Sequence, residues 1–162
     1  VMLSTGFHFP GPAAVRYPRG AGTGIAAGTD LASIEIGKAR VVRQGHELAI
    51  FSFGSTLSAA IPVAESLDAT LIDMRFIKPL DESLLRELAG THTRFVSVED
   101  NAVMGGAGSA VSEFFRSANI GVDLLQLGLP DAYQEHASRE QLLAEAGIDS
   151  AGILNAIKKR WV

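Results

Sequence analysis

Short apolar runs alternate with segments of helical spacing from about residue 34 onward, and this alternation constrains the fold more than any other feature. Each run is apolar at successive positions, as expected of a strand that is buried on both faces of a sheet. The runs lie at 47–53, 69–74, 94–99 and 122–127, after a first extended segment at 36–43. The segments between them carry apolar residues three and four apart, which is typical of amphipathic helices. The alternation predicts an α/β fold in which helices cover both faces of a largely parallel sheet.

Capping residues mark where several of the predicted helices begin and end. Asp81 can cap a helix that stops at Gly90. Ser138 and Gln141 form a capping-box pattern before another helix. The remaining helices are expected over 56–67, from Gly105-Gly106 onward, and over 149–161, where the basic cluster 158–160 complements the helix C-terminus.

The composition fits one globular domain with a short appendage. The 162 residues are 47% hydrophobic and carry a net charge of −4, which gives no basic footprint for nucleic acid. No apolar run reaches the roughly 18 residues that a membrane span needs, and no signal peptide is visible. The absence of cysteine excludes disulfide, thiolate and zinc–thiolate chemistry and agrees with the cytoplasmic location that we expect.

Residues 1–20 form a segment that cannot build a core of its own. They predict the end of a helix, a loop from Gly6 to Pro12 and a strand at 13–17. Val1 is not an initiator methionine, so we expect an excised, cleaved or truncated product. A stretch rich in Gly, Ala and Thr follows, and we divide the chain into a tail (1–20), a linker (21–33) and a domain (34–162).

Four motifs occur in order along the chain. Residues 14–20 (Ala-Val-Arg-Tyr-Pro-Arg-Gly) place two arginines beside a turn, and residues 99–109 join a carboxylate strand end to a glycine-rich helix start. The other two are Ile-Asp-Met-Arg-Phe-Ile-Lys-Pro-Leu-Asp at 72–81 and Leu-Gly-Leu-Pro-Asp at 127–131. Together they resemble the closing part of thiamine-diphosphate enzymes of the transketolase group. Within that group the resemblance is to the 1-deoxy-D-xylulose-5-phosphate synthase family.

This resemblance implies a fold and an activity. The implied fold is a three-layer α/β/α domain like the transketolase C-terminal domain, with a five-stranded mixed sheet in the order 1-3-2-4-5. Its first strand, at about 38–43, would run antiparallel to the others, and the tail would belong to the preceding pyrimidine-binding domain. The complete enzyme would condense pyruvate with glyceraldehyde 3-phosphate to 1-deoxy-D-xylulose 5-phosphate and CO2, for isoprenoid-precursor, thiamine and pyridoxal biosynthesis.

The resemblance also implies cofactors and partners. The complete enzyme would require thiamine diphosphate and Mg²⁺, but the Gly-Asp-Gly pattern with a downstream Asn that holds them is absent here. We therefore assign no catalytic, cofactor-binding or metal-binding residue to this segment and expect it to be inactive by itself. Its expected partners are the N-terminal remainder of the same enzyme, a second copy in a homodimer and the two small substrates, with neither nucleic acid nor a membrane.

Arg16 is the residue to which the resemblance assigns a substrate contact, the phosphate of the acceptor sugar. A guanidinium suits this role because it offers a planar fork of donors and keeps its charge. The alternative is a strand-end arginine that pairs with a surface carboxylate. His8 precedes the Arg16 strand and is a second candidate for touching substrate, whereas His46, His92 and His136 show no metal-ligand spacing.

The glycine-rich turn from Gly105 to Ser109 leaves two interpretations open. Gly105, Gly106 and Gly108 could allow close backbone packing at a domain or dimer interface. Alternatively, the turn could cradle a phosphate at a helix N-terminus beside the switch point of the sheet. It lacks both the Lys-Ser/Thr ending of a Walker A loop and the full GxGxxG spacing.

Glu99 and Asp100 end the strand before this turn. Adjacent residues of a regular strand face opposite ways, so a paired acid–base role is weakly supported, and Glu99 is expected at the helix start or in an interface. Two alternatives to a synthase segment therefore stay open. One is a free-standing phosphate- or nucleotide-binding α/β module, and the other is a structural assembly domain.

Overall fold

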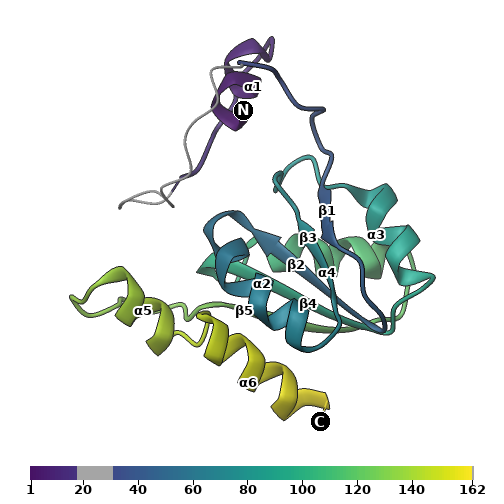
Figure 1. The fold of residues 1–162 in the computed structure, drawn as a ribbon. Helices are drawn as coiled ribbons and strands as arrows, with labels where there is room; N and C mark the ends of the chain where they lie inside the picture. Colours follow the sequence, from purple (N-terminus) through teal and green to yellow (C-terminus); the bar gives the residue numbers. More distant parts are fainter. Residues whose placement is uncertain (18–30, 162) are drawn as a thin grey trace.

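A computed structural model describes residues 1–17 and 31–161 of the chain (Figure 1). The strands are β1 (Arg40–Arg43), β2 (Leu48–Phe53), β3 (Thr70–Asp73), β4 (Arg94–Ala102) and β5 (Asp123–Leu129). The helices are α1 (Met2–His8), α2 (Leu57–Ser66), α3 (Glu82–Ala89), α4 (Ala107–Ser117), α5 (Arg139–Glu145) and α6 (Ser150–Trp161), with a 3₁₀ turn, η1 (Gly54–Thr56), before α2. The predicted Pro-Arg-Gly turn at 18–20 and the predicted linker as far as residue 30 lie outside the described residues.

The strands form one mixed five-stranded sheet in the order β1-β3-β2-β4-β5, which confirms the predicted order. β1 runs antiparallel to β3, and the other neighbours are parallel. The switch point of the sheet lies between β2 and β4, and the C-terminal ends of β2, β3, β4 and β5 meet at one edge, the carboxyl edge. Because Arg40, the first residue of β1, pairs with Asp73, the last of β3, the chain also enters the sheet at this edge.

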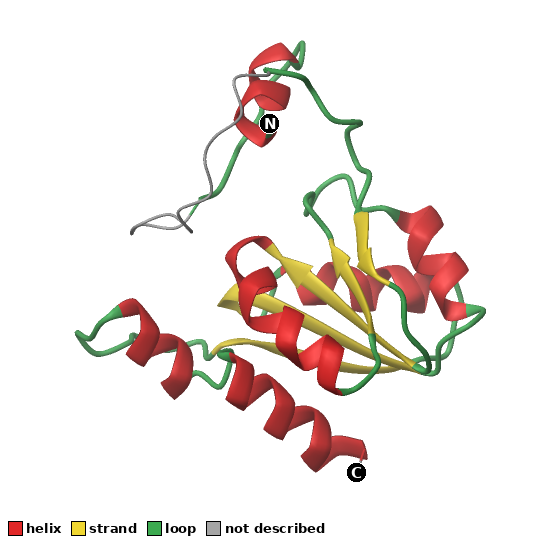
Figure 2. Ribbon diagram, in the orientation of Figure 1, coloured by secondary structure: helices red, strands yellow, loops and turns green. Residues whose placement is uncertain are grey.

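Helices cover both faces of the sheet, so the predicted three-layer α/β/α architecture is confirmed (Figure 2). On one face, Ile50 of β2 and Val96 of β4 pack against α2 and α6. On the other face, Phe51 and Phe95 of the same strands pack against α3 and α4. Adjacent residues of the central strands thus belong to two separate cores, one on each face, which explains why these strands are apolar at successive positions.

Two predicted helix caps are present. The Asp81 side chain accepts a hydrogen bond from the Leu84 N–H, and Ser138 and Gln141 form the predicted capping box before α5. Each cap satisfies backbone donors that the first turn of a helix leaves without an intrahelical partner.

The first strand starts later than predicted. The sequence pattern predicts a strand from residue 36, or from 38 by resemblance, but β1 begins at Arg40. Ile36 and Gly37 form a turn in which Gly37 has a φ of +76°, and the Ala39 N–H donates to the Asp81 carboxylate at 3.0 Å. A side chain therefore takes the hydrogen bond that strand pairing would have used.

The N-terminal tail also differs from the prediction. Gly6 to His8, expected in a loop, belong to α1, and residues 13–17, expected as a strand, form none. Strand geometry needs a neighbour for its backbone hydrogen bonds, and the described sheet contains only residues from 40 to 129. Figure 1 shows α1 standing away from the sheet, on the side where the chain enters β1.

Candidate functional site

The Glu99 carboxylate lies at the start of α4. Glu99 is buried, and its two oxygens accept hydrogen bonds from the Ala107 N–H at 2.7 Å and the Gly108 N–H at 2.8 Å. Both donors belong to the first turn of α4, where no intrahelical acceptor exists and the helix dipole favours negative charge. The buried charge is therefore compensated by charge-assisted hydrogen bonds within the domain.

The other backbone donors of the glycine-rich turn are also engaged. The Gly105 N–H donates to Ser109 Oγ at 3.2 Å, the Gly106 N–H to the Val103 carbonyl at 3.2 Å, and the Ser109 N–H to the Gly106 carbonyl at 3.1 Å. Together with the Glu99 contacts, every backbone N–H from Gly105 to Ser109 bonds within the protein. A phosphate would find no free donor here and would be repelled by the Glu99 charge. The geometry favours close packing over a ligand cradle.

Close packing explains two of the three glycines. A Cβ on Gly106 would overlap Glu99 Oε2 and the Ala102 carbonyl oxygen, and a Cβ on Gly108 would lie 2.5 Å from Ser97 Oγ. Both glycines therefore allow α4 to approach the end of β4. Gly105 is required by conformation instead, because its φ is +70°.

Asp100 points away from Glu99 and joins a second cluster at the switch point. Ser55, in η1 after β2, donates to Asp100 Oδ2 at 3.1 Å. Arg139 Nη2, at the start of α5, donates to Ser55 Oγ at 2.7 Å and to Asp100 Oδ2 at 3.1 Å. We call Ser55, Asp100 and Arg139 the edge latch. It fastens α5 across the crevice between β2 and β4, where open α/β sheets usually bind ligands.

Arg139 was not predicted as a site residue. It lies 84 residues after Ser55 and 39 residues after Asp100, so no local sequence pattern connects the three. An open hollow of about 440 Å³ is lined by Met104 after β4, Pro130 after β5 and Glu145 of α5, among others.

Arg16 and His8 lie on the N-terminal tail, away from the edge latch. Arg16 is exposed and has no hydrogen bond or ion pair with any residue in 1–17 or 31–161. His8 Nδ1 contacts the Ser4 carbonyl at 2.8 Å and Ser33 Oγ at 3.4 Å, so Nε2 is the ring nitrogen left for other partners. Within the part of the chain that the structure describes, no contact joins His8 to Arg16.

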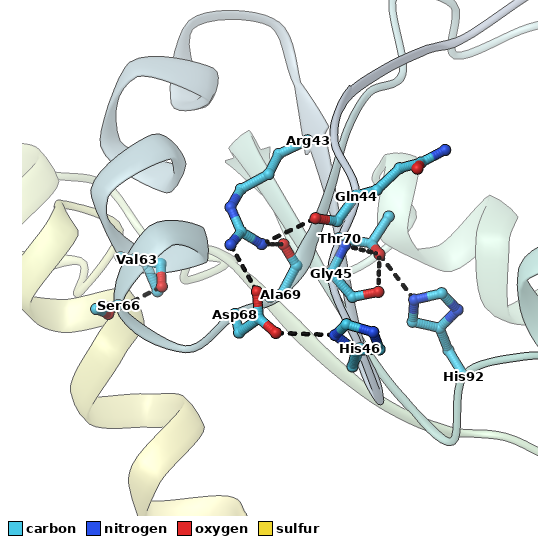
Figure 3. Close-up of polar contacts among 10 residues, drawn as sticks. All are labelled: Arg43, Gln44, Gly45, His46, Val63, Ser66, Asp68, Ala69, Thr70 and His92. Atoms are coloured by element: carbon cyan, nitrogen blue, oxygen red, sulfur yellow. Dashed lines mark hydrogen bonds and ion pairs between the residues drawn. The ribbon is translucent and has the colours of Figure 1, made fainter.

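The opposite edge of the sheet, the amino edge, holds a polar cluster (Figure 3). Asp68 accepts from Arg43 Nη2 at 2.6 Å and contacts His46 Nδ1 at 2.8 Å, and these hydrogen bonds lower the pKa of Asp68. Arg43 Nη1 also donates to the Ala69 carbonyl at 2.8 Å. The contacts fasten the turn after β1 to the start of β3.

His92 belongs to the same edge and contacts buried Thr70. The distance from His92 Nε2 to Thr70 Oγ1 is 2.8 Å, and Thr70 Oγ1 in turn accepts from the Gly45 N–H at 2.9 Å (Figure 3). Burial lowers the pKa of His92, and a hydrogen bond with the Leu88 backbone partly opposes this shift. The cluster joins three loops by hydrogen bonds, which is a structural role. His136 is exposed and lies before α5.

No metal-binding constellation is found among the described residues. Across 1–17 and 31–161, no three His, Asp or Glu side chains gather closely enough to hold an ion. Among the same residues, no helix has the length and apolarity required to cross a membrane.

Comparison with known proteins identifies what this arrangement is similar to. The 1-deoxy-D-xylulose-5-phosphate synthase of Pseudomonas aeruginosa is 58% identical over 98% of this chain, and that of Stenotrophomonas maltophilia is 56% identical over 99%. The chain spans only 25% of the length of either relative. A solved structure described as "Split gene transketolase, inactive beta4 tetramer" aligns with a TM-score of 0.73 and 28% identity, over 79% of this chain and 43% of its own.

The family assignment rests on the domain itself. Residues 37–153 match the family "Transketolase, C-terminal domain", and this range contains the whole five-stranded sheet and its switch point. The chain therefore belongs to the transketolase C-terminal domain family.

Proposed function

We propose that the chain is the C-terminal part of a thiamine-diphosphate-dependent 1-deoxy-D-xylulose-5-phosphate synthase, a transketolase-type transferase. The observation that carries this proposal is the 58% identity over 98% of the chain, because the similarity includes the tail as well as the domain. The complete enzyme joins pyruvate to glyceraldehyde 3-phosphate and releases CO2. The activity belongs to the complete enzyme, and this segment is inactive without the rest.

The proposal divides the chain as the sequence suggests. Residues 1–20 are the tail of the preceding pyrimidine-binding domain, 21–33 are a linker and 34–162 are the C-terminal domain. The separation of α1 from the sheet supports this division, and so does the burial of α1, in which Thr5 is the only buried residue and no residue belongs to either core of the domain.

Arg16 is the substrate-binding residue of this segment in the proposal. Its guanidinium is exposed and has no partner within 1–17 or 31–161, so it is available to an anion. A phosphate group offers the acceptor geometry that the guanidinium fork matches, and the permanent positive charge of Arg16 neutralises part of the phosphate charge. His8 is the second proposed contact, through Nε2.

Thiamine diphosphate and Mg²⁺ do not fit the residues present here. The backbone donors at the start of α4 are taken by Glu99, and no group of three potential ligands gathers within the described residues. We assign cofactor binding to the part of the enzyme that this chain does not span. What remains for this segment is to hold the acceptor phosphate and to complete the assembly.

Steady-state kinetics of the complete enzyme test the role of Arg16. Arg16→Ala should raise the KM for glyceraldehyde 3-phosphate at least about tenfold, because a charge-assisted contact to phosphate is lost. The KM for pyruvate should stay unchanged. The variant should also discriminate less between glyceraldehyde 3-phosphate and unphosphorylated glyceraldehyde, since the contact recognises only the phosphate.

Arg116→Ala is a matched control, because Arg116 is an exposed arginine in the last turn of α4. It should leave both KM values unchanged. An unchanged acceptor KM in Arg16→Ala would remove Arg16 from the site. A complete enzyme that forms no 1-deoxy-D-xylulose 5-phosphate from the two substrates, even when supplied with thiamine diphosphate and Mg²⁺, would overturn the proposed function itself.

A further inference from the structure

The most exposed apolar side chains gather on two parts of the chain. Among the described residues, every large apolar side chain that is at least half exposed lies either on the tail and residue 31 or in a loop at the carboxyl edge. On the tail they include Leu3, Phe7 and Tyr17, with Phe7 84% exposed. At the carboxyl edge they are Ile77, Met104 and Tyr133, exposed by 50%, 75% and 104%.

The rest of the described surface is different. Ile61 on α2 is only 38% exposed, and Val41 and Val42 on the edge strand β1 are 40% and 39% exposed. Singly scattered, half-covered apolar side chains of this kind are normal for a protein surface. The uneven distribution therefore distinguishes one side of the molecule from the others.

The topology places both apolar parts on that one side. Ile77, Met104 and Tyr133 follow β3, β4 and β5, whose C-terminal ends meet at the carboxyl edge. Because β1 is antiparallel to β3, residues 31–39 reach the sheet at the same edge. Figure 1 shows α1 and this segment beyond the carboxyl edge rather than over a helical layer. We call the tail together with these three loops the carboxyl-edge surface.

The tail is tied to the segment that enters the domain. The Ile34 N–H donates to Thr5 Oγ1 at 3.0 Å, and Ser4 Oγ donates to the Leu31 carbonyl. These contacts leave the apolar side chains of α1 uncovered, since Leu3 and Phe7 stay exposed. Phe, Tyr and Met are also the apolar residues enriched in protein interfaces.

We propose that the carboxyl-edge surface is a single docking surface, and that its occupant is the folded remainder of the same enzyme. This inference rests on the proposed function. Three quarters of the length of the similar synthases lies outside the region that this chain matches, so a large body is available to cover the surface. The carboxyl edge then binds a protein domain, while Glu99 takes the backbone donors at the start of α4 and the edge latch joins α5 to the ends of β2 and β4.

Cysteine labelling tests the surface, because the natural chain contains no cysteine. Phe7→Cys, Ile77→Cys and Met104→Cys are placed in this 162-residue chain and in the complete enzyme, with Ile61→Cys on α2 as the control outside the surface. Labelling by a maleimide is followed by peptide mass spectrometry, so that cysteines elsewhere in the complete enzyme do not interfere. Each rate is measured at two protein concentrations.

The proposal predicts that all three positions label at least about tenfold more slowly in the complete enzyme, because an interface core excludes solvent as a protein interior does. Ile61→Cys should label at the same rate in both. Equal rates at Ile77→Cys and Met104→Cys in the two proteins would overturn the proposal, and so would slowing at Phe7→Cys only. Slowing that appears in the 162-residue chain at the higher concentration would identify a second copy as the occupant, and would also overturn it.

A separate assay distinguishes failure of the surface from failure of the proposed function. The unmodified complete enzyme is tested for synthase activity with pyruvate and glyceraldehyde 3-phosphate. Activity with unprotected cysteines refutes the docking surface only. Protected cysteines without activity refute the proposed function while the docking surface stands.

Discussion

Glu99→Gln should destabilise the domain far more than its single-atom change suggests. The Glu99 carboxylate accepts from the Ala107 and Gly108 N–H groups at 2.7 and 2.8 Å, in a position where Glu99 is only 3% exposed. A glutamine side chain keeps one acceptor oxygen, but its amino group would face the other backbone donor. One charge-assisted hydrogen bond is lost, and one buried N–H is left without an acceptor.

The magnitude follows from these two losses. A hydrogen bond to a charged group contributes about 1.5–3 kcal/mol, and an unsatisfied buried donor costs about 1–3 kcal/mol. Because glutamine is neutral, the cost of burying a charge is also removed, and this gain offsets part of the loss in stability. We therefore expect the free energy of unfolding to fall by about 2–4 kcal/mol, which lowers Tm by about 4–16 °C in a protein of this size.

Urea unfolding of the 162-residue chain measures this change. Far-UV circular dichroism reports the helices, and the fluorescence of Trp161, the single tryptophan, reports α6. The control is Glu113→Gln on α4, the helix that Glu99 of β4 caps, since Glu113 is exposed and has no hydrogen bond or ion pair among the described residues. It should change the free energy of unfolding by less than about 0.5 kcal/mol. A Glu99→Gln variant as stable as the control would refute the proposed cap.

Three further changes test other parts of the structure. Gly106→Ala should lower the free energy of unfolding by about 1–3 kcal/mol in urea titrations, because its Cβ would overlap Glu99 and the Ala102 carbonyl. Burial lowers the pKa of His92 from its ordinary 6.5, so the folded chain binds fewer protons than the unfolded chain, and stability should fall as pH decreases below 6.5. His92→Gln should reduce this loss of stability at low pH, and an unchanged pH profile of stability would contradict the role of His92. Arg139→Ala should cost less than about 1 kcal/mol because the latch is partly exposed, but should speed amide hydrogen exchange in residues 130–141.

The sequence predicts the structure best where that structure depends on residues close together in the chain. The buried strands follow from apolar residues at successive positions, and the caps at Asp81 and Ser138 follow from spacing over three residues. The start of β1 was missed because it depends on a distant contact, in which the Asp81 carboxylate takes the Ala39 N–H. The tail was misassigned because residues 13–17 have no strand beside them in the described structure.

The candidate site shows the same limit more sharply. Arg139 reaches Ser55 across 84 residues, and that contact depends on how α5 crosses the carboxyl edge. No spacing within the sequence marks it. Arg16 is identified by resemblance and His8 by its position shortly before Arg16 in the sequence, and the roles of both stay predictions.

Glycine patterns at helix starts have two physical causes, and Glu99 separates them here. A phosphate loop uses glycines so that free N–H groups can surround an external anion. In this chain the same N–H groups meet a carboxylate supplied by the preceding strand, and the glycines make room for it. Once the anion is internal, the positive end of α4 is neutralised and the start of this helix offers no free backbone donor to a phosphate. What the carboxyl edge still offers is exposed Met104, Tyr133 and Ile77, which is why we infer that it recognises a protein surface.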